Sequence, residues 1–171
     1  MGPRGAAAVF GSQKGPNSVA DITRVDSGLQ RLADVLGLDA TQSGTGAAGG
    51  PGGALDVWGG VLAPGATEGA ELIGVADAIA DADVVITGEG SYDGQSNDGK
   101  VPSFLAGLAA DAGARAMLAA GLITSEADLS LFAASASLTD LAGSSDAALA
   151  EPACWSRVAG AELARSAARQ N

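Results

Sequence analysis

A short β-branched run, followed at once by a polar and glycine-rich segment, constrains the fold of this chain most. Residues Asp83 to Thr87 have the sequence DVVIT, which is typical of a buried strand in a parallel sheet. Ala114 to Ala120 predicts a second strand of this kind, and Leu129 to Ala134 is a candidate for a third. Because helical patterns alternate with these runs from residue 67 onward, the sequence predicts an α/β fold with a parallel sheet. The small number of strands suggests that the sheet is incomplete.

The clearest helix is predicted from Ser18 to Leu36, where apolar residues recur at steps of three and four. Ser18 fits the N-cap position, and Gly37 fits the end of the helix. The apolar positions expected to face a core are Val19, Ile22, Val25, Leu29, Leu32 and Leu36. Further helices are expected at residues 54–62, 67–80, from about Pro102, at 139–149 and at 152–168.

Several large or apolar side chains outside that helix are also expected to lie in the core. In the helix predicted at 67–80 the inward positions are Leu72, Ile73, Val75, Ala76 and Ile79. The aromatic residues Trp58, Trp155, Phe104 and Phe132 have apolar neighbours in the sequence, and Cys154 is expected to be a small buried residue.

Charge and composition exclude several classes of protein. The 171 residues include 20 acidic and 9 basic side chains, which gives a net charge of −11 and argues against a nucleic-acid groove. A single cysteine and the lack of histidine rule out an intrachain disulfide, a Cys/His zinc site and a Ser-His-Asp triad. The sequence shows neither a signal peptide nor an apolar run of about 18 residues, so we expect a cytoplasmic protein that does not enter a membrane.

The segment ITGEGSYDGQSNDGK, residues 86–100, is the first candidate site. It follows a predicted strand, and ligands of open α/β sheets lie beyond the carboxyl ends of the strands. Gly88, Gly90 and Gly94 would let backbone amides approach an anion. Glu89 and Asp93 could hold Mg²⁺, and Lys100 could meet a phosphate. The alternative interpretation is an ordinary turn rich in glycine and aspartate.

A second candidate is the segment SGTGAAGGPGG, residues 43–53, which precedes a predicted helix. Glycines before a helix can bind an anion through backbone amides, although a flexible connector fits the same composition. Lys14 and Lys100, which are the two lysines of the chain, both lie in glycine-flanked loops rather than on helix faces. Each is therefore a candidate for contact with an anionic ligand.

Four segments, taken together, resemble the bacterial glycerate kinase family. They are GPRGAAAVFGSQKG (2–15), GTGAAGGPGGAL (44–55), ADVVITGEGSYDGQSNDGKVP (82–102) and the helical tail that follows SLFAASAS (130–137). The third is the most specific, because it combines a strand, TGEG, an aromatic residue, Asp, Gln and GK. The resemblance covers almost the whole chain, but only about the carboxyl-terminal half of the family.

The resemblance implies a two-domain α/β fold. Residues 1–65 would be the remainder of the family's second, inserted domain, and residues 66–171 the carboxyl-terminal part of its Rossmann-like first domain. The resemblance also implies ATP and Mg²⁺ as cofactors and D-glycerate as substrate. Motif positions of the family are matched by Lys14, Gly49, Gly50, Glu89, Asp93, Gln95 and Lys100.

The activity implied by the resemblance is in-line phosphoryl transfer. Glu89, Asp93 and Lys100 would be catalytic, with Glu89 or Asp93 holding Mg²⁺ and Asp93 a candidate general base. Lys14, Gly49, Gly50, Gly88, Gly90 and Gln95 would bind substrate or phosphate. Two other interpretations stay open. One is an inactive fragment, or half of a split enzyme that needs its missing amino-terminal half or a partner chain. The other is a small anion- or nucleotide-binding module without transfer activity.

Overall fold

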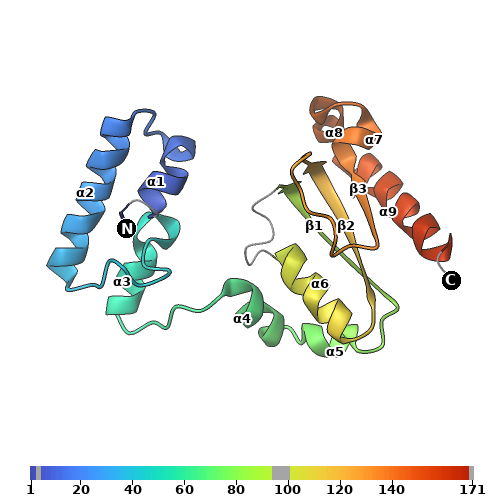
Figure 1. The fold of residues 1–171 in the computed structure, drawn as a ribbon, viewed down its shortest axis with the longest axis horizontal. Coiled ribbons are helices and arrows are strands. Elements are labelled where there is room, and N and C mark those ends of the chain that lie inside the picture. Colours follow the sequence, from blue (N-terminus) through green and yellow to red (C-terminus); the bar gives the residue numbers. More distant parts are fainter. Residues whose placement is uncertain (3–4, 94–100, 170–171) are drawn as a thin grey trace. The chain divides into compact units, whose positions relative to one another are not determined.

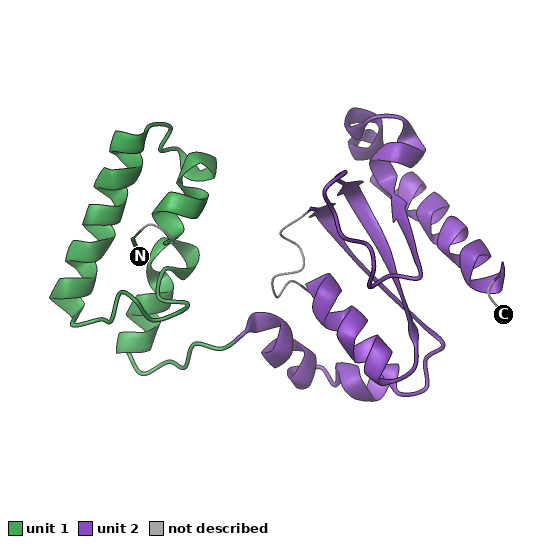
Figure 2. Ribbon diagram, in the orientation of Figure 1, with its two compact units in different colours: residues 1–63 green, residues 64–171 purple. Residues whose placement is uncertain are grey.

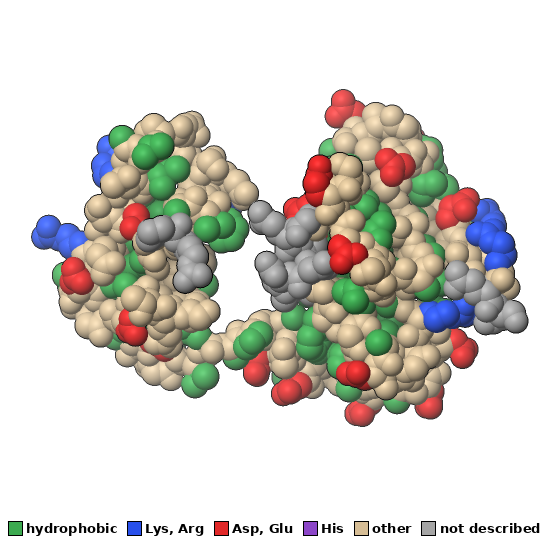
Figure 3. Space-filling model, viewed as in Figure 1, with side chains coloured by type: hydrophobic (Ala, Val, Ile, Leu, Met, Phe, Trp, Pro, Cys, Tyr) green, Lys and Arg blue, Asp and Glu red, His purple; other side chains and the backbone are tan. Residues whose placement is uncertain are grey.

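The computed structural model describes residues 1–2, 5–93 and 101–169, and it divides the chain into two compact units (Figures 1 and 2). Unit 1 comprises Met1–Ala63 and unit 2 comprises Pro64–Asn171. Charge is unevenly shared between them. By sequence, unit 1 has 4 basic and 5 acidic residues, whereas unit 2 has 5 basic and 15 acidic residues. Acidic side chains are accordingly spread over the visible face of unit 2 (Figure 3).

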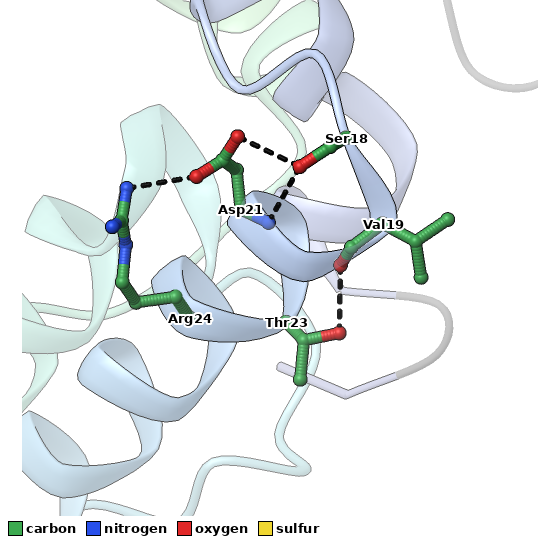
Figure 4. A network of polar contacts seen from close by, with 5 residues as sticks. All are labelled: Ser18, Val19, Asp21, Thr23 and Arg24. Atoms are coloured by element: carbon green, nitrogen blue, oxygen red, sulfur yellow. Dashed lines mark hydrogen bonds and ion pairs between the residues drawn. The ribbon is translucent and has the colours of Figure 1, made fainter.

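The described elements of unit 1 are all helical. They are α1 (Ala6–Phe10), η1 (Gly11–Lys14), α2 (Val19–Leu36), η2 (Ala47–Gly49) and α3 (Pro51–Val57). The predicted start of α2 is confirmed: the Ser18 hydroxyl oxygen accepts a 3.1 Å hydrogen bond from the Asp21 amide, and the Asp21 carboxylate pairs with Arg24 at 2.9 Å (Figure 4). Gly37 ends the helix with a φ of +68°, as predicted.

The apolar face of α2 is less covered than its spacing predicts. Within the helix Ala33 is buried, whereas Val19 is 83% exposed, and Val25, Leu32 and Leu36 are exposed as well. Trp58, which was expected in the core, follows α3 and is 84% exposed. The physical reason is the small size of the neighbours: half of the residues in α1 and α3, which pack against α2, are alanine or glycine and cannot cover long side chains.

Unit 2 is an α/β layer structure, as predicted. Its elements are α4 (Gly65–Leu72), α5 (Val75–Ile79), β1 (Val84–Tyr92), α6 (Val101–Asp111), β2 (Arg115–Ile123), β3 (Ala134–Ser137), α7 (Leu138–Ala142), α8 (Ser145–Ala150) and α9 (Pro152–Arg169). The three strands form a parallel sheet in the order β1-β2-β3, and Glu89 of β1 is aligned with Ala120 of β2.

Helices pack on both faces of this sheet (Figure 1). On one face Ala106 and Ala109 of α6 pack with Ala116 of β2. On the other face Ala159 and Leu163 of α9 pack with Met117. Ala116 and Met117 are neighbours in β2, and consecutive strand residues point to opposite faces. The core of unit 2 is therefore two apolar layers, both built largely from alanine.

The strands are longer or further along the chain than predicted. β1 continues to Tyr92, so residues 88–92 are strand where a loop was expected. The third strand lies at Ala134–Ser137 and not at 129–134. Glycines misled the prediction for β1, because Gly88 and Gly90 are typical of turns, whereas here both lie in the strand and Gly88 allows close contact with the backbone of β2.

Two predicted helices are each divided in two by a glycine. Gly74, with φ +68°, separates α4 from α5, and Gly143, with φ +81°, separates α7 from α8. As a result, Leu72 and Ile73 at the end of α4 are 87% and 76% exposed instead of buried. The helix expected at 54–62 begins earlier, at Pro51, because proline is favourable in the first turn of a helix.

The start of α9 at Pro152 is confirmed, but Cys154 in its first turn is exposed rather than buried. Trp155, Phe104 and Phe132 are half-buried. Within the described residues, we find no helix long and apolar enough to cross a membrane.

Candidate functional site

A hollow of about 1350 Å³ in unit 1 contains two of the predicted site residues. Lys14 and Gly49 both line it, and so do Phe10, Gly44 and Ala48. Its wall is formed by the first helices and the glycine-rich segment before α3, so residues far apart in the sequence meet there. The hollow is large enough for a small organic ligand.

Lys14 is the last residue of η1, where it is exposed and followed by Gly15 with φ +119°. This left-handed conformation favours glycine, and it turns the chain sharply just after the lysine. Lys14 therefore offers an ammonium group at the edge of the hollow, where an anionic group could meet it.

The glycine-rich segment is held by a buried threonine. Thr45 is fully buried, its hydroxyl donates to the Gln42 carbonyl at 2.9 Å, and its own carbonyl accepts from the Gly53 amide at 2.9 Å. These bonds tie the segment to the first turn of α3. The structure therefore gives the segment a hydrogen-bonded path beside the first turn of α3.

Three consecutive residues in this loop have left-handed backbones. Gly49 has φ +79° and Gly50 has φ +122°, which glycine adopts without strain. Ala48, with φ +54°, is the one described non-glycine residue with a positive φ. Gly50 is buried, and a side chain there would come within 3.2 Å of Leu29. The loop thus combines strain at Ala48 with a close contact at Gly50.

The second group of predicted residues lies along the end of β1 in unit 2. Glu89 is half-buried within the strand, and Asp93 is half-buried directly after it. Gly88 and Gly90 are strand residues rather than loop residues. A Cβ at Gly88 would overlap the Ala119 carbonyl oxygen, so Gly88 serves the contact between β1 and β2. An anion-binding role for Gly88 and Gly90 stays a prediction.

Tyr92 is the residue of this region that the sequence analysis missed. It is fully buried at the end of β1, and its ring packs edge-on against Phe132 with centroids 5.6 Å apart. Burial, reinforced by the negative charges of Asp128 and Glu89, raises the pKa of Tyr92 above its ordinary value. No local pattern in the sequence marks Tyr92, because its contacts are with residues distant in the sequence.

Gln95 and Lys100 lie outside the described residues, as does Gly94. Within the described part of the chain there is no group of three or more acidic, cysteine or histidine side chains suited to a metal ion. Glu89 is the sixth residue of β1 and Asp93 directly follows the strand, so the two are separated by about 13 Å of extended backbone. Either one could be the single protein carboxylate of a Mg²⁺ ion that completes its shell with water and phosphate. Either carboxylate is therefore of a donor type that suits a magnesium ion.

The structure thus places the described candidates in two groups, Lys14 with Gly49 in unit 1 and Glu89 with Asp93 in unit 2. Unit 2 has an α/β architecture, with a parallel sheet covered by helices on both faces. Proteins of this class bind their ligands at the carboxyl ends of the strands. A sequence model described as the glycerate kinase family matches residues 1–168. The chain belongs to the glycerate kinase family.

Individual relatives agree with this assignment. The chain is 37% identical over 164 residues to an uncharacterized protein of Mycobacterium bovis, covering 90% of this chain and 42% of that one. It is 40% identical over 115 residues to the glycerate 2-kinase of Escherichia coli, covering 64% and 30% of the two chains. A glycerate kinase of Haemophilus influenzae is 40% identical over 107 residues, covering 59% and 28%.

One solved structure is similar over most of the chain. A protein of Salmonella typhimurium LT2, assigned provisionally as glycerate kinase 2, superposes with a TM-score of 0.57 at 31% identity. The match covers 95% of this chain and 46% of that chain. The chain spans less than half the length of these relatives.

Proposed function

We propose that this chain carries part of the machinery of an ATP-dependent glycerate kinase, which transfers a phosphoryl group to D-glycerate in the cytoplasm. The observation that carries the proposal is the shared hollow of Lys14 and the glycine-rich loop, in a chain that belongs to the glycerate kinase family. An ammonium group beside exposed backbone suits a small anionic ligand, and D-glycerate and ATP are both anions.

In unit 1, Lys14 binds a carboxylate or phosphate oxygen as a positive point charge. Gly49 lies in the wall of the hollow, and because glycine has no side chain a ligand can approach its backbone. Gly50 is buried beside it and is assigned to this site from the motif alone. Phosphoryl transfer depends mainly on positioning and on neutralising charge, and both can be supplied by such a wall and a lysine.

In unit 2, Asp93 is the general base that accepts the proton of the glycerate hydroxyl, and Glu89 would hold Mg²⁺. The support is that both carboxylates are half-buried, Glu89 in the carboxyl-terminal half of a parallel strand and Asp93 directly after it, and ligands of α/β sheets lie beyond the carboxyl ends of the strands. The magnesium ion, when bound with ATP, neutralises charge on the phosphates. Lys100 and Gln95 are assigned to phosphate and substrate from the motif alone.

The test is release of ADP by the purified chain in the presence of ATP and Mg²⁺. We expect release with D-glycerate and a background rate without an acceptor or with L-glycerate. A rate that does not respond to D-glycerate, with or without a partner chain, would overturn the proposal. Binding of ATP that raises the melting temperature without any turnover would instead favour a nucleotide-binding module.

A second candidate, half of a split enzyme, is favoured by the apolar surface of unit 2. Leu72 and Ile73 of α4 are 87% and 76% exposed, and Ile86 of β1 is 57% exposed. Exposed apolar side chains of this size commonly mark a surface that a partner covers. Activity that appears only after addition of a chain carrying the other segments of the family would establish this candidate.

A further inference from the structure

Tyr92 is the buried side chain at the end of β1, which also pairs with β2 through its backbone. Of residues 88–92 in β1, it is the one that is fully buried; Gly88, Gly90 and Ser91 are exposed, and Glu89 is half-buried. In the described sheet β1 is an outer strand, paired along its length only with β2. The two glycines contribute no side-chain packing, so the burial of Tyr92 dominates the stability of this end.

The contacts of Tyr92 connect the end of β1 to the segment between β2 and β3. Its hydroxyl donates to the Asp128 backbone carbonyl at 3.3 Å, and its own backbone carbonyl accepts from the Thr124 amide at 3.0 Å. Tyr92 belongs to a buried cluster with Leu118 and Ala120 of β2, and Phe132, Leu129, Ala127 and Ile123 pack against this cluster. Within it, the Tyr92 ring meets the Phe132 ring edge-on. The backbone, the hydroxyl and the ring of Tyr92 are thus all fixed by contacts with this part of the chain.

This anchoring lies between the two carboxylates of the proposed site. Glu89 precedes Tyr92 in the same strand, and Asp93 follows it directly. When a catalytic group is displaced by about 1 Å from its productive position, the rate of the reaction can fall by about a hundredfold. The position of both carboxylates therefore depends on the side chain between them.

We infer that Tyr92 is a positioning residue for phosphoryl transfer, and that its buried ring and bonded hydroxyl fix the strand end that carries Glu89 and Asp93. The inference rests on the proposed function. Most of the effect is assigned to the ring, because the ring lies in the apolar cluster, whereas the hydroxyl makes one hydrogen bond.

The experiment compares Tyr92→Phe and Tyr92→Leu with the wild type, using the chain together with its partner if activity requires one. Phe104→Leu is the matched control, because it also replaces an aromatic ring of unit 2 by leucine, in α6, which belongs to neither group of site residues. Each variant is assayed for kcat and KM by ADP release, and for its melting temperature.

We expect Tyr92→Leu to lower kcat by about tenfold or more while KM for ATP changes by less than about threefold. Tyr92→Phe should retain most of the wild-type kcat. Phe104→Leu should leave kcat nearly unchanged, even if it lowers the melting temperature as much as Tyr92→Leu does. Equal kcat values for Tyr92→Leu and Phe104→Leu would overturn the inference, since a general loss of stability would then explain both.

Hydrogen exchange gives a second readout that does not need activity. In Tyr92→Leu, amides of residues 88–93 should exchange faster, while amides of α9 keep their wild-type rates. Unchanged exchange at 88–93 would overturn the inference whatever the activity. A wild-type chain that is inactive even with a partner would overturn the proposed function, and the exchange rates would then decide the anchoring by themselves.

Discussion

Lys14 and Gly49 line the same hollow, although one ends a short helix near the start of unit 1 and the other lies in the loop before α3. The meeting of these two residues makes the hollow a candidate for binding anions. A positive side chain at the rim and exposed backbone in the wall are complementary to a carboxylate or a phosphate. The first prediction tests this relationship.

Replacing Lys14 by alanine should weaken binding of the anionic ligand by about tenfold, because one charge-assisted hydrogen bond to a ligand is worth about 1.5–3 kcal/mol. The measurement is KM for D-glycerate and for ATP at two salt concentrations. Arg24→Ala is the control: Arg24 is also a cation of unit 1, but it pairs with Asp21 on the exposed side of α2. If both variants raise KM equally, only the overall charge of unit 1 matters.

Asp93→Asn should lower turnover by about a hundredfold or more, because the amide cannot accept the proton that a general base takes up. The change keeps the size of the side chain, so the melting temperature should stay close to that of the wild type. Asp111→Asn, at the exposed end of α6, removes the same charge from unit 2 and should leave turnover unchanged. Wild-type turnover in Asp93→Asn would remove Asp93 from the mechanism.

The sequence predicts the elements of this fold better than their ends. Period-three and period-four spacing, together with Ser18 and Gly37, locates α2 nearly to the residue. The helix predicted at 67–80 is divided at Gly74, because a left-handed glycine ends a helix whose apolar pattern continues. Local spacing cannot show which glycines adopt that conformation.

The candidate site shows the same limit. The motif residues Glu89 and Asp93 could be selected from the sequence, because carboxylates after an apolar run are a local pattern. Tyr92 could not, because its importance comes from contacts with Phe132 and with the backbone of Asp128, which are distant in the sequence. The exposure of Trp58 likewise depends on how few large residues surround it, and an apolar local sequence does not show this.

Ala48 offers a test of strain in the glycine-rich loop. An L-residue in the left-handed region costs about 1–2 kcal/mol, so Ala48→Gly should relieve strain and stabilise the chain by about 0.5–1 kcal/mol after the added freedom of the unfolded state is subtracted. Ala47→Gly is the matched control, because Ala47 is the neighbouring alanine but has a helical backbone, and it should destabilise by about 0.5–1 kcal/mol. Urea unfolding, followed by circular dichroism, measures the free energy of unfolding of both variants. Destabilisation by Ala48→Gly would show that the loop relaxes in solution.

Tyr92 should make the chain less stable at alkaline pH. Burial first, and then the charges of Asp128 and Glu89, raise its pKa above the ordinary value of 10.0, so the folded chain holds the phenolic proton more tightly than the unfolded chain does. The stabilisation is therefore fully present below pH 10 and is lost as the pH rises from there through the folded-state pKa.

Because Tyr92 is the only tyrosine in the sequence, the ultraviolet absorbance of tyrosinate reports on this residue alone. We expect a titration midpoint above 10.0 in the native chain and near 10.0 in urea. Tyr92→Phe should abolish the signal and flatten the fall in melting temperature at alkaline pH. A native midpoint equal to that in urea would mean that the ring is open to solvent, and the anchoring of the β1 end by Tyr92 would then be wrong as well.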